Sequence, residues 1–343
     1  MRGADKPIRS SGVSRRRVLA GVAAASVAAL AAPRLAFAAK DKVVLQMGWI
    51  KSVQYGGYFA GLEKGFFDAE GIETEFLTGG PSIDSINVVA SGQALVGDRD
   101  STNIILARAK GIPVKAFAAP YQMSPYALIA AKGKKISTLK EMEGKTIAIP
   151  QGRRATMAAL LKRANVDATK ITFVPTGTDP GILATGQVDG YFGWYTNQGS
   201  MLTQRGFAID YTTEHDLGNP TYPVALFALD ETIDKKKDLL ARYFRAQAKA
   251  WKWFAENPEA VARATVEKYG PRGLDLEQQI GEAKITAPLI MMGEAATNGP
   301  LWIDTPFFRD GIAFGKEAGF LATDVAVSSV VTQDIAKAGK APG

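Results

Sequence analysis

The chain has 343 residues, with 41 Lys and Arg, 34 Asp and Glu, one histidine and no cysteine. The absence of cysteine excludes disulfides, thiolate metal sites and cysteine nucleophiles, and one histidine cannot build a multi-histidine metal cluster. We therefore expect no metal and no other cofactor.

The first 38 residues predict an export signal. A basic stretch with Arg15-Arg16-Arg17 precedes an apolar run over 18–32, and Ala36-Phe37-Ala38 has the form of a cleavage site. The paired arginines indicate the twin-arginine route. The alternative, an uncleaved membrane anchor, needs about 20 apolar residues, and this run is shorter. We expect cleavage after residue 38 and a mature protein in the periplasm.

Removal of this segment changes the charge balance. It holds seven Lys or Arg and one Asp, which leaves 34 basic and 33 acidic residues in the rest of the chain. A nearly neutral chain gives no reason to expect a nucleic-acid or membrane-surface partner. The remaining 305 residues are enough for two domains of ordinary size.

The mature chain opens with a strand, a loop, a helix and a second strand. The strands are expected over 43–47 and 73–77, and the helix between them over 57–64, ending at Gly65. Ligands of open α/β sheets bind at loops that leave the carboxyl ends of strands. The candidate pocket residues here are Trp49, Ser52, Tyr55, Tyr58 and the turn Gly79-Gly80-Pro81-Ser82.

The same stretch resembles the NMT1/THI5-like group. The shared features are a tryptophan after the first strand, an aromatic and glycine loop, Gly65-Phe66-Phe67 followed by Gly71-Ile72, and a glycine-rich turn. The resemblance runs from about residue 43 to 222. It implies a solute-binding protein of an ABC importer, similar to binders of sulfonates, nitrate, thiamine-type pyrimidines and riboflavin, with permease transmembrane subunits as partners.

The middle of the chain continues with alternating elements. A helix over 82–91 leads through Gly92-Gln93 into a strand, and the same step recurs at Gly186-Gln187. We interpret the two steps as equivalent parts of two similar lobes, although glycine at a helix end is also ordinary βαβ punctuation. Further strands are expected over 114–118, 126–131, 145–149, 171–174 and 207–211, and helices over 102–110, from 153 or 154 to 164, and from Asp179-Pro180 onward.

The last third of the chain is expected to be helical. A strand over 224–229 precedes a long amphipathic helix over 235–255. Further helices are expected from Pro258 and over 276–285 and 306–318, followed by a poorly ordered polar tail after Val331.

This order predicts an α/β, periplasmic-binding-protein-like fold with two lobes, parallel-rich sheets and a ligand cleft between them. Lobe I comprises 39–119 plus 223–343, and lobe II comprises 120–222. Two hinge crossings are expected, near Pro120 and within 219–223, because such proteins close about hinges. We expect a monomer.

Three aromatic residues and an asparagine extend the candidate pocket. Tyr121 and Trp194 come first, followed by Tyr195 and Asn197. Together with Trp49 and Tyr55 they could enclose a flat ring, which adds about 0.5 to 1.5 kcal/mol per aromatic pair beyond area burial. The alternative is ordinary packing inside a lobe, and it applies most directly to Tyr58, which is on a helix.

Charged residues give a second set of candidates. Gly152, Arg153 and Arg154 stand at a helix start, where backbone N–H groups and cations suit an anion, or they are simply solvated. Gly80 and Ser82 offer a similar arrangement, or only a helix cap. Asp98 follows a strand and could accept ligand hydrogen bonds, or Arg99 pairs with Asp98 or Asp100 on the surface while Ser101 caps the next helix. Asp189 and His215 are assigned to structure.

These observations favour a periplasmic solute-binding protein without catalytic activity. The aromatic candidates favour a flat heterocycle such as a thiamine-precursor pyrimidine or a flavin, and a sulfonate, taurine or nitrate is the alternative. Fungal pyrimidine synthases resemble this fold, but they need a histidine and a cysteine-rich motif, which a chain with one histidine and no cysteine cannot supply. A Ser-His-Asp arrangement is not visible either. A receptor lobe of a sensor or scaffold is the third class.

Overall fold

The computed structural model describes residues 39–80, 82–219 and 221–340. The predicted export signal and cleavage site lie outside the described residues, as do Pro81 of the glycine turn and Pro220 of the return crossing. Among the helices of the described ranges, none combines the length and the apolar character that a bilayer crossing requires.

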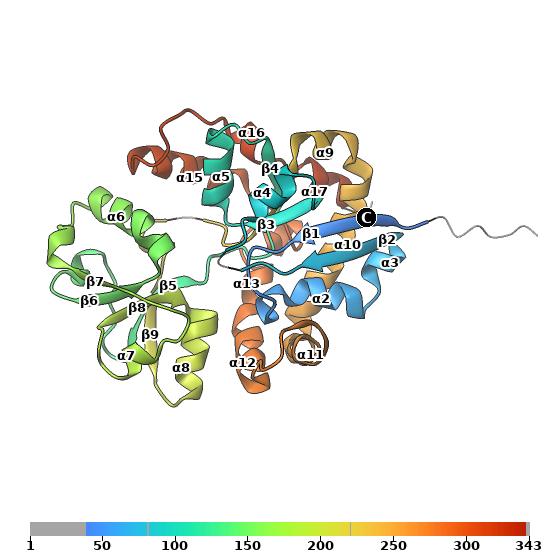
Figure 1. The fold of residues 1–343 in the computed structure, drawn as a ribbon. Coiled ribbons are helices and arrows are strands. Elements are labelled where there is room, and N and C mark those ends of the chain that lie inside the picture. The colour runs from blue at the N-terminus through green and yellow to red at the C-terminus, as the bar shows by residue number, and fades with distance from the viewer. Residues whose placement is uncertain (1–38, 81, 220, 341–343) are drawn as a thin grey trace, which may run out of the picture. The chain divides into compact units, whose positions relative to one another are not determined.

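Two five-stranded sheets organise the chain (Figure 1). The first has the order β2-β1-β3-β10-β4, with β1 parallel to β2 and β3, and β10 antiparallel to β3 and β4. Its strands are β1 Asp41–Gln46, β2 Ile72–Leu77, β3 Val96–Arg99, β4 Val114–Ala118 and β10 Ala225–Leu229. Four strands therefore run in one direction and one runs against them, so the predicted parallel-rich sheet is confirmed.

The second sheet repeats this arrangement. Its order is β7-β6-β8-β5-β9, with β6 parallel to β7 and β8, and β5 antiparallel to β8 and β9. Its strands are β5 Tyr126–Ala131, β6 Thr146–Ile149, β7 Thr172–Pro175, β8 Gly190–Trp194 and β9 Ile209–Thr213. The boundaries of the two lobes remain a proposal, with 39–119 plus 223–343 in one and 120–222 in the other.

The two Gly-Gln steps occupy equivalent places in these sheets. Gly92 follows α4 (Ser85–Ala90) and precedes β3, while Gly186 follows α7 (Gly181–Ala184) and precedes β8. Both glycines have a positive φ, 77° and 71°, which suits glycine at a helix end. The expected correspondence between the two steps is confirmed.

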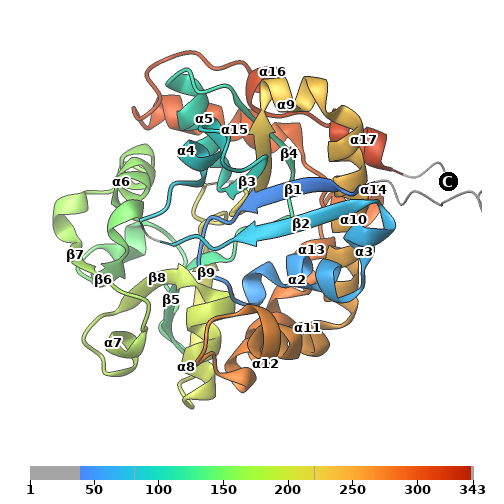
Figure 2. The ribbon, with the colours of Figure 1, turned by 45° about the vertical axis from the view of Figure 1, so that its right-hand side comes forward.

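Helices cover both faces of the first sheet (Figures 1 and 2). On one face lie α2 (Gly56–Glu63), α3 (Phe66–Ala69) and α10 (Lys237–Glu256); α4, α5 (Ser101–Ala109) and α15 (Thr305–Glu317) lie on the other. A Cβ on Gly57 would stand 2.2 Å from the Trp251 ring, so glycine allows α2 to approach α10. The long predicted amphipathic helix is confirmed as α10, with the unpredicted α9 (Asp230–Lys235) before it.

The remaining helices complete the two groups. The second sheet carries α6 (Arg154–Arg163), α7 and α8 (Ser200–Gln204). The C-terminal third adds α11 Pro258–Ala264, α12 Leu276–Thr286, α13 Pro288–Met291, α14 Ala295–Asn298, α16 Val327–Val330 and α17 Asp334–Gly339. In α15, Phe308 and Ile312 pack in the core of the first sheet, whereas Phe314 packs in that of the second. This helix therefore bridges the two cores.

The tail is ordered over 332–340, contrary to the prediction. Thr332 N donates to Ala116 O over 2.9 Å, next to a bridge between Val331 and Ala116. In α17, Ile335 and Ala336 are buried in the same core as α10. The prediction rested on the small polar residues of this segment. The apolar face of α17 is nevertheless enough to hold the segment against the core.

Two helix starts also differ from the prediction. The helix after the glycine turn begins at Ser85 and is capped by Asp84, whose Oδ1 accepts from Ile86 N, so Ser82 is not a cap. Asp100 caps α5 by accepting from Asn103 N, and Ser101 is the first residue of that helix. An aspartate carboxylate is at least as good a cap as a serine hydroxyl, which explains both differences.

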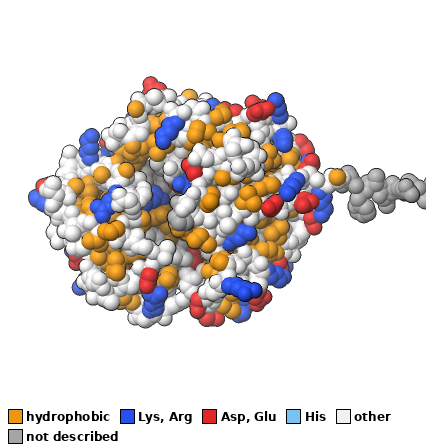
Figure 3. All heavy atoms as spheres, in the orientation of Figure 1, with side chains coloured by type: hydrophobic (Ala, Val, Ile, Leu, Met, Phe, Trp, Pro, Cys, Tyr) orange, Lys and Arg blue, Asp and Glu red, His pale blue; other side chains and the backbone are white. Residues whose placement is uncertain are grey.

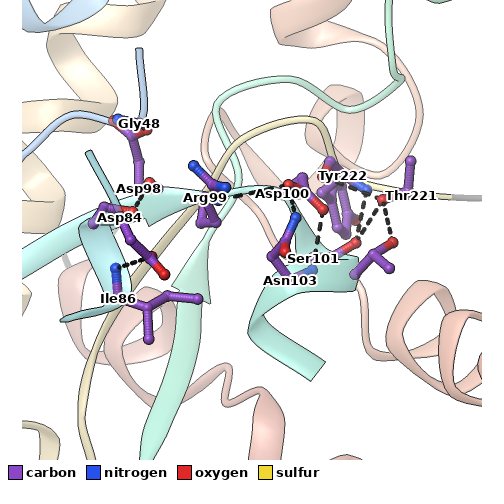
Figure 4. A network of polar contacts seen from close by, with 12 residues as sticks. Gly48, Asp84, Ile86, Asp98, Arg99, Asp100, Ser101, Asn103, Thr221 and Tyr222 are labelled. Carbon is purple, nitrogen blue, oxygen red and sulfur yellow. Dashed lines mark hydrogen bonds and ion pairs between the residues drawn. The ribbon is translucent and has the colours of Figure 1, made fainter. Parts of the chain in front are cut away.

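Both chain crossings are tied by hydrogen bonds. Ser101 N donates to Tyr222 O over 3.0 Å, and the hydroxyls of Ser101 and Thr221 are 2.9 Å apart (Figure 4). On the outgoing crossing, Gln122 Nε2 donates to Trp302 O over 2.8 Å. Each crossing is thus fixed at one end, and a hinge role for them remains a proposal.

Candidate ligand site

The loop after β1 and the turn after β2 fit closely together. Gly79 N donates to Trp49 O over 3.0 Å, and a Cβ on Gly79 would stand 2.2 Å from Met47 O. Only glycine allows this approach. The Trp49 side chain is left 39% exposed at the carboxyl end of β1, where the sequence places a pocket wall. Ser52 is half-buried in the same loop.

Asp98 anchors this loop from β3. The prediction placed Asp98 after a strand, but it lies within β3, opposite Leu226 of β10, and it is buried. Its Oδ1 accepts from Gly48 N over 2.7 Å and its Oδ2 accepts from the Tyr58 hydroxyl over 3.0 Å. Figure 4 shows Asp98 directed toward Gly48 and Arg99 directed away from Asp98. Burial of Asp98 excludes a surface ion pair between Asp98 and Arg99, and Arg99 Nε lies 3.9 Å from Asp100 Oδ2 instead.

Three predicted aromatic residues lie inside the first core. Tyr55, Tyr58 and Tyr121 are at most 2% exposed. The Tyr58 ring stacks on Phe76 at 5.0 Å and meets Trp251 edge-on at 5.5 Å, and the Tyr121 hydroxyl donates to Gln54 O. Packing accounts for their positions in the described structure, and a direct contact with ligand stays a prediction for each of them.

Arg153 and Tyr126 form a stacked pair beside the second sheet. Arg153 lies in the turn after β6, and its Cζ is 3.7 Å from the centroid of the Tyr126 ring. The Tyr126 ring meets Trp194 edge-on at 5.8 Å, and Trp194 meets Tyr121 edge-on at 6.0 Å. We call Arg153, Tyr126 and Trp194 the aromatic–guanidinium stack. It extends from the carboxyl ends of β6 and β8 to the outgoing crossing.

Tyr126 was missed as a site residue because it reads as the first residue of a strand. The position of Tyr126 directly after the crossing was the signal that could have identified it.

Glu214 was also missed. It is buried, with Oε2 3.5 Å from Arg153 Nη1. Burial raises the pKa of Glu214, the Arg153 charge opposes that effect, and the charge of Asp100 raises the pKa further. Asp100 follows β3 of the first sheet, and Glu214 follows β9 of the second.

The two predicted anion-binding arginines point to different partners. Arg153 pairs with Glu214, whereas Arg154 Nη2 donates to Phe173 O over 3.0 Å and its Cζ lies 5.6 Å from the Phe173 ring. Gly152 is exposed in the turn before α6, and Gly80 is buried with open space where its Cβ would be. The structure therefore does not bring Arg153 and Arg154 together on one anion.

Tyr195 and Asn197 lie in a π-helical turn, Tyr195–Gly199, that follows β8. The Tyr195 ring stacks on Tyr211 at 4.2 Å. Asn197 Nδ2 donates to Glu282 Oε2 of α12 over 2.5 Å. Neither side chain lies in the aromatic–guanidinium stack, and Asn197 connects this turn to the C-terminal helices.

The surface in Figure 3 is hollowed between the portion built on β5–β9 and the portion built on the first sheet, with basic side chains near the edge.

Within the described residues, no group of three His, Asp or Glu side chains is arranged to hold a metal. Asp189 is structural as predicted, because its Oδ2 accepts from Thr146 N over 2.8 Å. The ring of His215 stacks on Phe307 at 6.1 Å.

A family model described as NMT1/THI5 like matches residues 52–261. The chain belongs to the NMT1/THI5-like family. One relative is a formylaminopyrimidine-binding protein of Halalkalibacterium halodurans, 22% identical over 267 residues, which covers 76% of this chain and 80% of the relative. Another is the riboflavin-binding protein RibY of Chloroflexus aurantiacus, 25% identical over 322 residues, with 87% of both chains covered.

The chain is also similar to an enzyme and to a solved structure of the same fold. The enzyme is 4-amino-5-hydroxymethyl-2-methylpyrimidine phosphate synthase of Schizosaccharomyces pombe, 24% identical over 222 residues, covering 60% of this chain and 63% of the relative. The structure is the periplasmic aliphatic sulphonate binding protein SsuA of Escherichia coli, with a TM-score of 0.65 and 14% identity, covering 84% of this chain and 92% of the other. The predicted periplasmic-binding-protein-like fold is confirmed.

Proposed function

We propose that this chain is the solute-binding component of an ABC importer and that its ligand is a flat, nitrogen-containing heterocycle. The observation that carries the proposal is the aromatic–guanidinium stack at the carboxyl ends of β6 and β8. Flat π-systems and a guanidinium plane bind a flat ring over its whole face. Two relatives named for a pyrimidine and for riboflavin support the same class.

Trp49 supplies the second wall in this proposal. It is the largest exposed aromatic side chain among the described residues, and it stands after β1 of the first sheet. Closure of the two lobes over the ligand would bury both walls, and the closed form would dock on the permease subunits. We further propose that the chain acts in the periplasm after export by the twin-arginine route, as a monomer.

A small anion is less well supported as the ligand. Arg153 already has Glu214 as a countercharge, and Arg154 already donates to Phe173 O. An anion at Arg153 would lie near the buried Glu214 carboxylate, which opposes its binding. A sulfonate or nitrate therefore has no unshared arginine at the predicted position.

Catalysis is also less well supported than binding. The relative from Schizosaccharomyces pombe is an enzyme, yet this chain has one histidine and no cysteine. That histidine stacks on Phe307 and is assigned to structure. We therefore propose a binding role without turnover.

The test is a thermal-shift and calorimetric screen of the purified protein against aminopyrimidines, riboflavin, alkanesulfonates and nitrate. A ligand present at 100 times its Kd adds about 2.7 kcal/mol to the free energy of unfolding. We expect a shift with a heterocycle. A shift with anions alone would overturn the proposal.

Alanine variants then locate the site. Trp49→Ala and Trp194→Ala are expected to weaken the heterocycle at least tenfold, which corresponds to about 1.4 kcal/mol. The matched control is Trp253→Ala on α10, a partly buried tryptophan that lies under Lys64 and belongs to neither wall. Equal affinities in all three variants would remove both walls from the site.

A further inference from the structure

A buried glutamate lies where α12 meets the π-helical turn Tyr195–Gly199, and nothing above uses it for binding. Glu282 is fully buried. Its Oε2 accepts from Asn197 Nδ2 over 2.5 Å, from Gln278 Nε2 over 3.1 Å and from Gln279 Nε2 over 3.3 Å. Its Oε1 is also buried but has no hydrogen-bond partner within the part of the chain that the structure describes.

Two threonine hydroxyls on the same two elements have no partner among the described residues either. Thr286 follows Glu282 by four residues on α12, so the two side chains share a helix face. Thr196 adjoins Asn197, which bonds to Glu282. The Oγ1 atoms of both threonines are buried and unpaired among the described residues. Three buried polar atoms without partners thus lie on α12 and on the turn, the two elements that the Asn197–Glu282 hydrogen bond joins.

Such a cluster needs donors from outside the chain. A buried polar group without a hydrogen bond is strongly unfavourable, and a charged group more so. Native proteins satisfy these groups with water or with a ligand. Among the described residues, no Lys or Arg nitrogen lies within 4.0 Å of the Glu282 carboxylate. The hydrogen bonds to this carboxylate therefore come from amide side chains alone.

The position of Glu282 connects it to the proposed site. The turn it contacts begins directly after Trp194 of the aromatic–guanidinium stack. Its neighbour Gln279 accepts from Val53 N over 2.7 Å, in the loop that carries Trp49. Burial raises the pKa of Tyr121, whose ring Trp194 meets edge-on, and the charge of Glu282 raises that pKa further.

We propose that Glu282 Oε1, with the hydroxyls of Thr196 and Thr286, accepts hydrogen bonds from N–H groups of the ligand. The site then selects heterocycles with an exocyclic amino group or a ring N–H, and it rejects their N-alkylated analogues. This inference rests on the proposed function and adds the ligand chemistry that the site recognises. The walls hold the face of the ring, whereas Glu282 recognises its edge.

The test compares matched ligands on the full protein. The pairs are 4-aminopyrimidine with 4-dimethylaminopyrimidine and riboflavin with 3-methylriboflavin, each measured by calorimetry at pH 8. Burial raises the pKa of Glu282 to about 7, so its carboxylate is ionised at this pH. A hydrogen bond to a charged acceptor predicts that the N–H member of the pair that fits binds about 10- to 100-fold more tightly. Equal affinity within every pair that binds would overturn the inference and leave the proposed function standing. No binding of any heterocycle would overturn both.

Glu282→Gln is the informative variant. The Oε2 position receives three N–H donors, so the amide oxygen takes that position and the NH2 group replaces Oε1. The NH2 group of the glutamine then faces the N–H group of the ligand, and two donors cannot form a hydrogen bond. We therefore expect the preference for the N–H ligand over its N-alkylated partner to fall to about threefold or less. Glu277→Gln, exposed on the same helix, is the control and keeps the preference. An unchanged preference in Glu282→Gln overturns the inference. If that variant does not fold, the wild-type comparison alone decides.

Discussion

The guanidinium of Arg153 lies over the ring of Tyr126, with 3.7 Å between Cζ and the ring centroid. The same guanidinium stands 3.5 Å from the buried carboxylate of Glu214. Arg153 is therefore held on two sides by groups from other strands or loops of the second sheet. The position of Arg153 at a helix start suggests anion binding. Between Tyr126 and Glu214, its guanidinium instead presents a rigid, flat surface.

Arg153→Met should destabilise the protein. The change leaves Glu214 buried without its countercharge, which is expected to lower the free energy of unfolding by about 3 to 5 kcal/mol. Adding Glu214→Gln should recover part of the loss, because the uncompensated charge is gone. Urea denaturation of the two single variants and the double variant measures the coupling. Simple additivity would contradict this account of the pair.

Gly79→Ala should be harmful and Gly80→Ala should not. A Cβ at Gly79 meets the backbone at Met47 O and Trp49 N, 2.2 and 2.5 Å away, whereas a Cβ at Gly80 meets nothing within 4 Å. Forced overpacking of this kind typically costs about 1 to 3 kcal/mol. Thermal denaturation and heterocycle affinity should both worsen in the first variant alone. Equal effects would show that the close approach of the two loops is unimportant.

Asp98 should make stability depend on pH. Burial raises the pKa of Asp98 to about 7, which its hydrogen bonds from Gly48 and Tyr58 and the nearby Arg99 charge only partly oppose. The folded state therefore binds the proton more tightly than the unfolded state, whose carboxyl has a pKa near 3.8. The stability associated with Asp98 is present below about pH 4 and is lost as pH rises toward 7.

The test is Asp98→Asn, which keeps an oxygen for Gly48 N and removes the titration. The wild type should lose stability as the pH rises, and the variant should not. The free energy of unfolding of Asp98→Asn minus that of the wild type should therefore increase by a few kcal/mol from pH 4.5 to pH 8. Burial raises the pKa of Glu282 to about 7 as well, so the difference between the two proteins is the relevant quantity. Parallel stability curves over this range would exclude a titrating Asp98.

Ile335→Ala should show that the C-terminal helix is part of the fold. Ile335 is fully buried in the core that contains α10. Truncating such a side chain typically costs about 2 to 5 kcal/mol. Lys337→Ala, exposed on the same helix, is the control. Denaturation midpoints that agree for the two variants would restore the original expectation of a loosely attached tail.

Local signals were enough to predict most elements of the fold. Gly65 and Gly111 end helices with a positive φ, as their places after helical stretches suggested. The apolar run over 126–131 matches β5, and the periodic stretch ahead of Glu256 is α10. These features depend on residues within a few positions of one another, which is why the sequence reveals them.

The candidate site could be predicted only in part. Trp49 and Arg153 were recognised because they follow strands, and the structure leaves Trp49 exposed and stacks Arg153 on an aromatic ring. Tyr126, Glu214 and Glu282 were missed. Their significance comes from partners in other segments, and no local pattern marks those partners.

The sequence by itself determined the alternation of strands and helices, the positions of the tight turns and the family, because these follow from local backbone preferences and short motifs. The tertiary structure decided which side chains are available. It enclosed Tyr58 and Asp98 in a core, with the hydroxyl of one donating to the other. It also joined Asn197 to Glu282, 85 residues further along the chain. Burial and hydrogen bonding between distant segments are properties of the packed chain, and they determine which polar atoms remain for a ligand.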